Sequence, residues 1–343
     1  MAPKVAAIAM VKDECDIIEH FVRWNLKVVD HLFVIDHNSH DATPEILILL
    51  KEEGLPITIW HEERIDHNQA AFLSDKMLEI ADSDEFEFII PLDADEFINC
   101  EYGHFGTLLS KEIKPAHCGV MPWITYIPQS DDCLLDAPPK LHETFMMQNM
   151  EGETSTKTVI PNDVAKSSTL AEGNHFALHG GLPVAPILLP AALLHVPIRS
   201  APQIIKKALN GSHKLSIKET RAPREGAHWD ALAAYIRRRN YTLTKDDMVW
   251  LARHYAMTEL EAPTKAVPEV AKTGPKVGIP FEQLKYANLG TTRPMRAIDA
   301  LAHELCGEIR TLRIELAQLH AAMSTSKKPP SVLRSFFSFT GTP

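Results

Sequence analysis

The stretch Phe86–Asn99, FEFIIPLDADEFIN, indicates the fold of this chain more clearly than any other. Its first half is an apolar run of the kind that forms a strand buried on both faces. Its second half holds three acids within four residues, Asp93, Asp95 and Glu96. Two carboxylates about 4 Å apart repel by roughly 4 kcal/mol at an effective dielectric constant near 20. Solvent, protonation or a divalent cation must therefore reduce the repulsion between these carboxylates. Mg2+ and Mn2+ prefer such oxygen ligands.

An acidic turn exposed to solvent is the alternative interpretation of the same residues. The buried strand before the acids and the apolar pair Phe97 and Ile98 after them favour a binding site instead. In open α/β sheets, ligands bind outside the carboxyl ends of the strands, which is where this cluster is expected. The pattern therefore predicts a cation site at Asp93 and Asp95.

Composition and charge limit the class of protein. The 343 residues are 45% apolar and 23% charged, which is typical of one large globular domain with an appendage or of two modest domains. The formal net charge of −10 argues against nucleic acid as a partner. The five cysteines include no C-x-x-C motif, so neither a zinc site nor a disulfide framework is expected. We expect no targeting signal and no membrane span, hence a cytoplasmic protein, with contact to the inner face of a membrane left open.

Strand and helix patterns alternate before and through the acidic stretch. Strands are expected over Lys4–Val11, His31–Ile35, Pro56–Trp60 and Phe86–Leu92, and helices over Glu14–Val28, Thr43–Leu50 and His67–Ala81. This order predicts a mostly parallel, Rossmann-like sheet covered by helices. Right-handed connections bring all strand carboxyl ends to one edge. Thr43 is expected to cap the second helix, with Pro44 at its first position.

Polar segments follow each of these four strands. They are Lys12–Glu14, Asp36–Asp41, Glu62–Gln69 and Asp93–Glu96. Neither a glycine-rich dinucleotide fingerprint nor a P-loop follows the first strand. A phosphate ligand at this edge therefore needs a cation, which the acidic cluster could hold.

Four segments together resemble the glycosyltransferase family 2-like group, which has the GT-A fold. They are IAMVKDECDIIEHFVRWN, FVIDHNSHDAT, FIIPLDADEFI and LLHVPIRSAPQIIKKALNG. The group's corresponding elements typically read K-N-E, D-N-G-S-T-D, D-A-D-E-F and H-Y-x-x-R-S…K. The resemblance covers Lys4–Gly211, about three-fifths of the chain. Asp13, Asn38 and His40 depart from the group's usual Asn, Gly and Thr, although Asn tolerates left-handed backbone better than most residues.

The resemblance implies a metal-dependent glycosyltransferase with a UDP- or GDP-linked sugar donor and a glycan or glycolipid acceptor, in cell-surface polysaccharide synthesis. It implies that Asp36 and Asp41 face the nucleoside. Asp93 and Asp95 would act in catalysis by holding the ribose and Mn2+ or Mg2+, and His195 would complete the metal site. Guanidinium groups suit bidentate phosphate contacts. The other expected donor-binding residues are Lys12, Glu14, Asn38, Arg64, Asn68, Gln69 and Arg199.

Several assignments stay open between a functional and a structural role. A catalytic base must take the proton of the acceptor if the reaction inverts, and Glu143 is the first choice. Its rivals are Asp131 and Asp132. His195 could instead be a hydrogen-bonded core residue. Asn68 and Gln69 either contact the donor or only cap a helix. Trp123 and Tyr126 either stack on a sugar ring or pack in the core. His175 either lines the acceptor side or lies in a surface loop.

The expected domains are a catalytic unit over 1–211, a helical extension and linker over 212–290, a long helix over 295–323 and a disordered tail over 324–343. The donor half of the catalytic unit is about 1–100 and the acceptor half about 101–211. Helices are expected over Trp229–Arg239 and Asp246–Met257. The basic run Arg237–Arg239 either contacts an anionic acceptor or lipid headgroups, or is a solvated face.

Apolar residues recur at spacings of three and four along 295–323. This heptad pattern predicts either a coiled coil between two copies of the chain or a helix lying along the catalytic unit. The phenylalanines of the tail could touch a membrane weakly. Two other classes of protein stay open: a metal-dependent nucleotidyltransferase, which normally has a Gly/Arg/Lys-rich first turn, and a non-catalytic scaffold assembled through the long helix.

Overall fold

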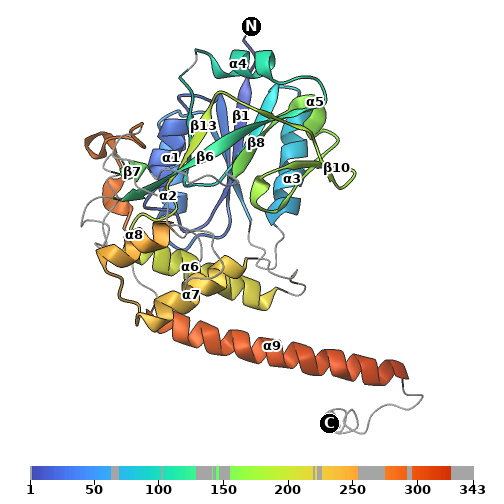
Figure 1. The fold of residues 1–343 in the computed structure, drawn as a ribbon, viewed down its shortest axis with the longest axis vertical. Coiled ribbons are helices and arrows are strands. Elements are labelled where there is room, and N and C mark those ends of the chain that lie inside the picture. The colour runs from blue at the N-terminus through green and yellow to red at the C-terminus, as the bar shows by residue number, and fades with distance from the viewer. Residues whose placement is uncertain are drawn as a thin grey trace, which may run out of the picture.

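The structure, a computed structural model, describes residues 2–62, 69–101, 103–128, 141, 144–146, 155–218, 221, 226–253, 275–291 and 296–325. A central sheet carries helices on both faces, a group of three helices lies at the carboxyl ends of its first strands, and one long helix crosses beneath that group (Figure 1). Within the described residues, no helix is long and apolar enough to cross a membrane.

Four parallel strands form the first half of the sheet, in the order β3-β2-β1-β4. They are β1 (Val5–Val11), β2 (His31–Asp36), β3 (Ile57–His61) and β4 (Phe88–Leu92), connected through α1 (Ile18–Asn25), α2 (Thr43–Glu52) and α3 (Gln69–Asp82). Alternate residues of β1 enter two different cores: Val5 and Ala7 pack with α1 and α2, whereas Ala6 and Ile8 pack with α3. The strand is fully buried because both of its faces are covered.

The second half of the sheet is mixed and continues the order as β4-β8-β6-β13-β5. Its strands are β5 (Glu96–Asn99), β6 (Cys118–Pro128), β7 (Thr144–Met146), β8 (Thr156–Pro161), β12 (Pro186–Leu188) and β13 (Ala192–His195). Because β13 runs antiparallel to β5, His195 pairs with Glu96 and reaches the acidic turn. The expected fold class, a mostly parallel Rossmann-like sheet with a C-terminal helical extension, is confirmed.

Short elements complete this part of the chain. They are α4 (Phe105–Glu112), α5 (Asn162–Ala165), a small sheet of β9 (Thr169–Leu170), β10 (Ala177–His179) and β11 (Leu182–Pro183), and the 3-10 turns η3 (Glu172–Asn174), η4 (Phe281–Gln283) and η5 (Ala287–Leu289).

Three helices build a second core beside the sheet. They are α6 (Ala201–Ile217), α7 (Ala227–Arg238) and α8 (Lys245–Arg253). The hydroxyl of Ser200 caps α6 by accepting a hydrogen bond from the backbone N–H of Gln203, and Pro202 occupies the first turn, where its missing N–H costs nothing. This cap fixes where α6 begins, directly after the strand that carries His195.

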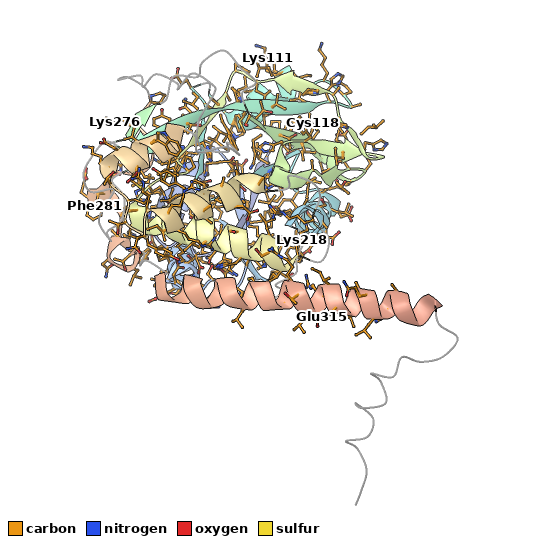
Figure 2. The ribbon with its side chains drawn as sticks, turned by 60° about the horizontal axis from the view of Figure 1, so that its bottom comes forward. Lys111, Cys118, Lys218, Lys276, Phe281 and Glu315 are labelled. Carbon is orange, nitrogen blue, oxygen red and sulfur yellow. The ribbon has the colours of Figure 1, made fainter. Side chains whose placement is uncertain are left out.

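The long helix α9 (Arg296–Thr325) lies against α6, and its C-terminal end extends past the other described elements (Figure 2). The thiol of Cys306 contacts the carbonyl of His213, and Arg313 donates to the carbonyl of Ile217. Part of the predicted apolar seam is exposed to solvent: Leu305, Ile309, Leu312 and Leu316.

The cap expected at Thr43 is wrong. The N-cap position is Ala42, which makes no side-chain cap hydrogen bond. Asp41 instead accepts from both the backbone N–H of Thr43 (2.9 Å) and its hydroxyl (2.5 Å), and that hydroxyl accepts from the N–H of Glu14 (2.9 Å). The carboxylate two residues earlier is the stronger acceptor, so Thr43 connects two loops instead.

Candidate active site

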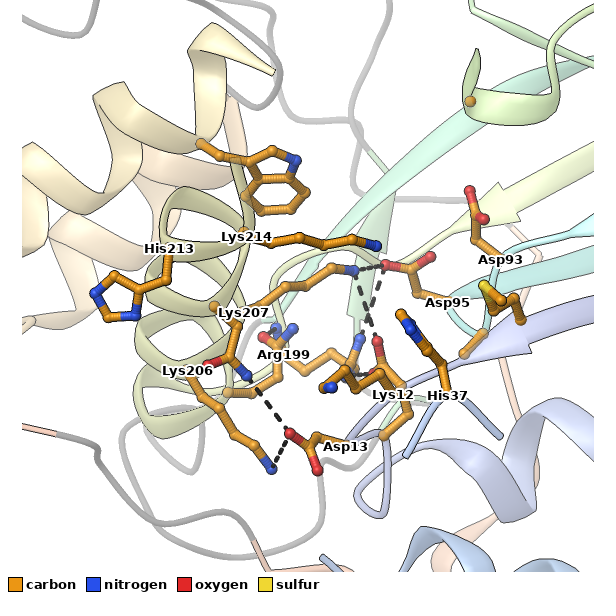
Figure 3. Close-up of a pocket in the computed structure, with 18 of the residues that line it drawn as sticks. Lys12, Asp13, His37, Asp93, Asp95, Arg199, Lys206, Lys207, His213 and Lys214 are labelled. Atoms are coloured by element: carbon orange, nitrogen blue, oxygen red, sulfur yellow. Dashed lines mark hydrogen bonds and ion pairs between the residues drawn. The ribbon is translucent and has the colours of Figure 1, made fainter. Parts of the chain in front are cut away.

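A cavity of about 480 Å³ lies between the carboxyl ends of the first strands and helix α6 (Figure 3). This volume falls in the range of small-molecule sites. The turns after β1, β2 and β4 all contribute to its lining, and α6 forms the opposite wall. We call Glu14, Asp95, His195, Arg199 and Lys207 the inner end of the pocket. The outer end is formed by α6, α7 and α9 through Asn210, His213, Lys214, Ile217, Trp229 and Cys306.

Asp95 is the centre of the inner end and is 2% exposed. One of its oxygens lies 2.5 Å from the ammonium of Lys207, and the other lies 3.8 Å from Nε2 of His195. Burial alone would raise the pKa of Asp95, but Lys207, His195 and Arg199 together hold it below its ordinary value. The carboxylate is therefore ionised and surrounded by donors.

His195 is neutral at physiological pH. Burial lowers its pKa to about 4, against the opposite influence of Asp95. Its ring stacks on Trp123, with ring centroids 4.1 Å apart and an interplanar angle of 25°. The imidazole is thus held in place with Nε2 toward Asp95, as a metal ligand or a hydrogen-bonding group requires.

Asp93 has different partners from Asp95, two residues away. Its carboxylate lies 2.5 Å from the ammonium of Lys157, whose side chain is fully buried and is also 3.1 Å from Glu96. Burial raises the pKa of Glu96 to about 8. Burial would lower the pKa of Lys157, but Asp93 and Glu96 raise it, so this amine stays charged. Glu96 also accepts from the backbone N–H of Asp93 (2.8 Å), which makes it a support of the acidic turn.

Arg199 connects the first turn to α6. Its guanidinium donates to both oxygens of Asp16 (2.7 and 2.9 Å) and to Glu14 (2.5 Å). Burial would lower its pKa, but Asp16 and Glu14 raise it. Its Nη1 is buried without a hydrogen bond among the described residues and lies 3.9 Å from Asp95. This nitrogen is therefore a buried donor that faces Asp95.

The second turn supports the first. Asn38 has the left-handed backbone (φ 52°) that its glycine-like position requires, and it lines the pocket. Asp36 accepts from the backbone N–H of Ser39 and lies 3.1 Å from His61, whereas Asp41 binds Thr43 and Lys206. Burial would raise the pKa of Asp41, but these two partners lower it. Neither Asp36 nor Asp41 is among the residues that line the described cavity.

The remaining predicted residues fall into three groups. Lys12 lines the pocket, and its side chain is exposed. Tyr126 is a core residue whose hydroxyl donates to the carbonyl of Pro275, while His175 lies 2.7 Å from the carbonyl of Thr156 and packs edge-on against Trp123. The following lie outside the described residues or, for Gln69, have no described side chain: Arg64, Asn68, Gln69, Asp131, Asp132 and Glu143.

The sequence prediction included Arg199 but missed Lys157 and Lys207, the cations that face Asp93 and Asp95. Lys207 had a local signal, because Gln203, Lys207, Asn210 and Lys214 recur at spacings of four and three and therefore share one face of α6. Lys157 had none, since it is an isolated lysine in a short strand. Its partner Asp93 is 64 residues away in the sequence.

The inner end could supply part of the coordination of one divalent cation, through Asp95 and His195. Within the described residues, no three His, Cys, Asp or Glu side chains are grouped closely enough to hold a metal. An oxygen of Asp95 and Nε2 of His195 are 3.8 Å apart, which allows both to contact one ion at bond lengths of about 2.1 Å. Asp93 instead faces Lys157. Mg2+ and Mn2+ commonly take their remaining ligands from substrate phosphates and water, so Asp95 and His195 are the residues that could hold such an ion together with a bound nucleotide.

Comparison with known proteins finds distant structural similarity. No family model and no curated protein matches the sequence. The chain is similar to the Pyrobaculum calidifontis mannosyltransferase PcManGT, solved with GDP-Man and Mn2+, with 13% identity, a TM-score of 0.36 and coverage of 74% of this chain and 79% of that one. It is similar to S. aureus TarS, with 16% identity, a TM-score of 0.34 and coverage of 72% and 45%, so the chain spans less than half of that TarS chain.

A third structure belongs to another class of enzyme. A putative glucose-1-phosphate thymidylyltransferase from Bacillus anthracis has 9% identity, a TM-score of 0.29 and coverage of 47% of this chain and 73% of that one. All three TM-scores are below 0.5, so these similarities by themselves assign no function to this chain.

Proposed function

We propose that this chain is a GT-A glycosyltransferase that moves a sugar from a nucleotide-diphosphate donor, UDP- or GDP-linked, to a glycan or glycolipid acceptor. We further propose that the protein acts in the synthesis of cell-surface polysaccharide. It would do so from the cytoplasm, either in solution or in contact with the inner face of a membrane. The observation that carries the proposal is the inner end of the pocket. There an ionised carboxylate, a neutral imidazole, the buried guanidinium of Arg199 and the partly exposed ammonium of Lys207 converge at the strand ends, and no glycine-rich loop is among the described residues that line the cavity.

This arrangement suits a diphosphate leaving group. Transfer breaks the bond between the anomeric carbon and the diphosphate oxygen and forms a bond to the acceptor oxygen, so negative charge grows on the diphosphate. Arg199, through its unbonded Nη1, and Lys207 and Lys12 would bind that charge. Mn2+ or Mg2+ held by Asp95 and His195 would supply further charge neutralisation. Glu143 remains the proposed acceptor of the hydroxyl proton.

Lys207 and a divalent cation compete for the same carboxylate. The ammonium of Lys207 lies 2.5 Å from Asp95, and its side chain is 23% exposed, so it can move. Lys207 pairs with one oxygen of Asp95 while His195 faces the other, so a cation held by Asp95 and His195 would weaken the pairing of Lys207, whose ammonium could then contact the diphosphate oxygens. We therefore expect the metal to bind weakly without nucleotide and more tightly with it.

The test is the identity of the product and its dependence on metal. Purified protein is incubated with UDP- and GDP-sugars and a lysate glycan fraction, with Mn2+ or with EDTA. Release of nucleoside diphosphate with Mn2+, and its loss in EDTA, is the expected result. Release of pyrophosphate from a nucleoside triphosphate and a sugar phosphate would instead assign a nucleotidyltransferase. Failure of any nucleotide to raise the melting temperature in Mn2+ would favour a non-catalytic scaffold.

We also propose that a second copy of the chain pairs through α9. Leu305, Ile309, Leu312 and Leu316 follow the heptad spacing, and all are at least 38% exposed. A narrow apolar seam with this spacing is typical of a helix that pairs with an identical helix in a coiled coil. Light scattering after size exclusion is expected to show a dimer that Leu312→Glu with Leu316→Glu converts to a monomer. A monomeric wild type would contradict the pairing.

A further inference from the structure

A fully buried lysine lies against the acidic turn. Lys157 belongs to β8, which lies between β4 and β6 in the sheet, and it is paired in register with Met121 of β6. Its side chain is 0% exposed. A buried ammonium is costly unless it is paired and hydrogen-bonded, so its partners must account for its place in the core.

Three oxygens surround the ammonium of Lys157. Its Nζ lies 2.5 Å from Oδ2 of Asp93 and 3.1 Å from Oε1 of Glu96, and it donates to the carbonyl of Gly173 at 3.2 Å. Two carboxylates and one carbonyl are ligands that a hard divalent cation prefers. The ammonium is therefore held by the kind of oxygen set that elsewhere holds a metal ion.

The acidic turn is built around this ammonium. Glu96 accepts from the backbone N–H of Asp93 at 2.8 Å, and the N–H of Glu96 donates in return to the carbonyl of Asp93 at 3.0 Å. The side chain of Glu96 is 0% exposed, whereas that of Asp93 is 36% exposed and lines the cavity. Lys157 thus connects a core acid to an acid of the pocket.

The two aspartates of the turn differ in how firmly their cations are held. Figure 3 shows the carboxylate of Asp93 turned away from that of Asp95. The lysine that faces Asp95, Lys207, is 23% exposed and can move. Lys157 cannot follow a moving partner, because it is enclosed in the sheet. If Asp93 left it to join a metal, the buried ammonium would keep Glu96 as its one carboxylate among the described residues.

We propose that Lys157 is a positioning residue whose ammonium takes the place of a metal ion at Asp93, so that a divalent cation binds through Asp95 and His195 without Asp93. Lys157 neutralises Asp93 and fixes its carboxylate whether or not a metal is bound. The two aspartates therefore have separate roles, and one metal site does not use both. This inference concerns the metal site of the proposed glycosyl transfer and rests on that function.

The test is the affinity for Mn2+, measured from the electron paramagnetic resonance of free Mn2+ with and without UDP or GDP. The variants are Asp93→Asn, the double variant Lys157→Met with Glu96→Gln, and this double variant with Asp93→Asn added. Methionine keeps the apolar stem of lysine without its ammonium. Glu96→Gln removes the acid that would otherwise stay buried without a cation, so the double variant should fold. Lys166→Met, which removes an exposed lysine paired with Asp84, is the matched control.

Asp93→Asn and Lys166→Met should bind Mn2+ within about twofold of the wild type, because neither changes a ligand of the metal. The double variant should bind Mn2+ about tenfold more tightly without nucleotide, since Asp93 becomes free to join the ion, and the added Asp93→Asn should remove this gain. A merely structural role of Lys157 would lower the affinity instead. A loss beyond twofold in Asp93→Asn, or no gain in the double variant, overturns the proposal.

The same measurements separate this inference from the proposed function. A gain in the double variant, with a wild type whose Mn2+ affinity no nucleotide raises, keeps the role of Lys157 and rejects the proposed transfer. A wild type that binds Mn2+ more tightly with nucleotide, and loses that binding in Asp93→Asn, rejects the role of Lys157 alone. Asp93→Asn leaves Lys157 paired with Glu96, so it decides the question even if the double variant does not fold.

Discussion

The two ends of the pocket handle charge in opposite ways. At the inner end each acid already faces a cation: Asp95 is 2.5 Å from Lys207, and Glu14 is 2.5 Å from Arg199. At the outer end, α6, α7 and α9 supply lysine, histidine and tryptophan to the described lining but no acid. A ligand at the inner end must therefore exchange internal partners. This exchange is what the proposed coupled binding of metal and nucleotide requires.

The largest effect is expected next to the inner end, at the fully buried ammonium of Lys157. Lys157→Met leaves Asp93 and Glu96 without their buried cation, and removal of one partner from such a pair costs about 3–5 kcal/mol of unfolding free energy. Urea denaturation measures this loss. Lys166→Met, which removes an exposed lysine paired with Asp84, is the control and should leave stability nearly unchanged. Equal losses in both variants would contradict the distinction.

Removal of the central carboxylate should stop transfer while leaving the outer end intact. Asp95→Asn is expected to lower the transfer rate by about 10²–10³-fold, because the leaving diphosphate loses the cation that neutralises it. Asp230→Asn, which changes an acid behind the outer wall, should retain most of the activity. Initial rates of nucleoside diphosphate release measure both variants. A rate within threefold of wild type in Asp95→Asn would remove Asp95 from the mechanism.

The affinity for Mn2+ tests whether Lys207 and a metal compete for Asp95. Lys207→Met removes the ammonium that competes with a metal for Asp95, so Mn2+ affinity without nucleotide should rise about tenfold. Electron paramagnetic resonance of free Mn2+ measures this affinity. Lys214→Met is the matched change on the same helix face and should alter it little. Unchanged affinity in Lys207→Met would show that the two cations do not compete.

The smallest effect concerns an ion cluster outside the pocket. Arg23 lowers the pKa of Glu53 to about 2, with burial opposing it and Lys285 and Tyr286 assisting. A lowered carboxyl pKa stabilises the folded state above the unfolded value near 4.5, and this stabilisation is lost as the pH falls from there toward 2. The melting temperature should therefore decline less steeply over this range in Glu53→Gln than in wild type. Parallel declines would show that the cluster contributes nothing.

Much of the sheet could be predicted from the sequence, because hydrophobic periodicity is a local property. The strands β1 to β4 and the polar turns after them follow from the apolar runs around Val5–Val11 and Phe88–Leu92. The different orientations of Asp93 and Asp95 could not be predicted. They depend on Lys157 and Lys207, which are 64 and 112 residues away in the sequence. Long-range ion pairs of this kind leave no periodic signal.

Nucleotide affinity with and without metal tests the central claim most directly. UDP and GDP are titrated calorimetrically into wild type and Asp95→Asn, each in Mn2+ and in EDTA. We predict that at least one nucleotide binds the wild type ten or more times more tightly in Mn2+ than in EDTA, and that Asp95→Asn loses this difference. Equal affinity in Mn2+ and EDTA, or an undiminished metal effect in Asp95→Asn, would contradict a divalent cation at Asp95 and His195.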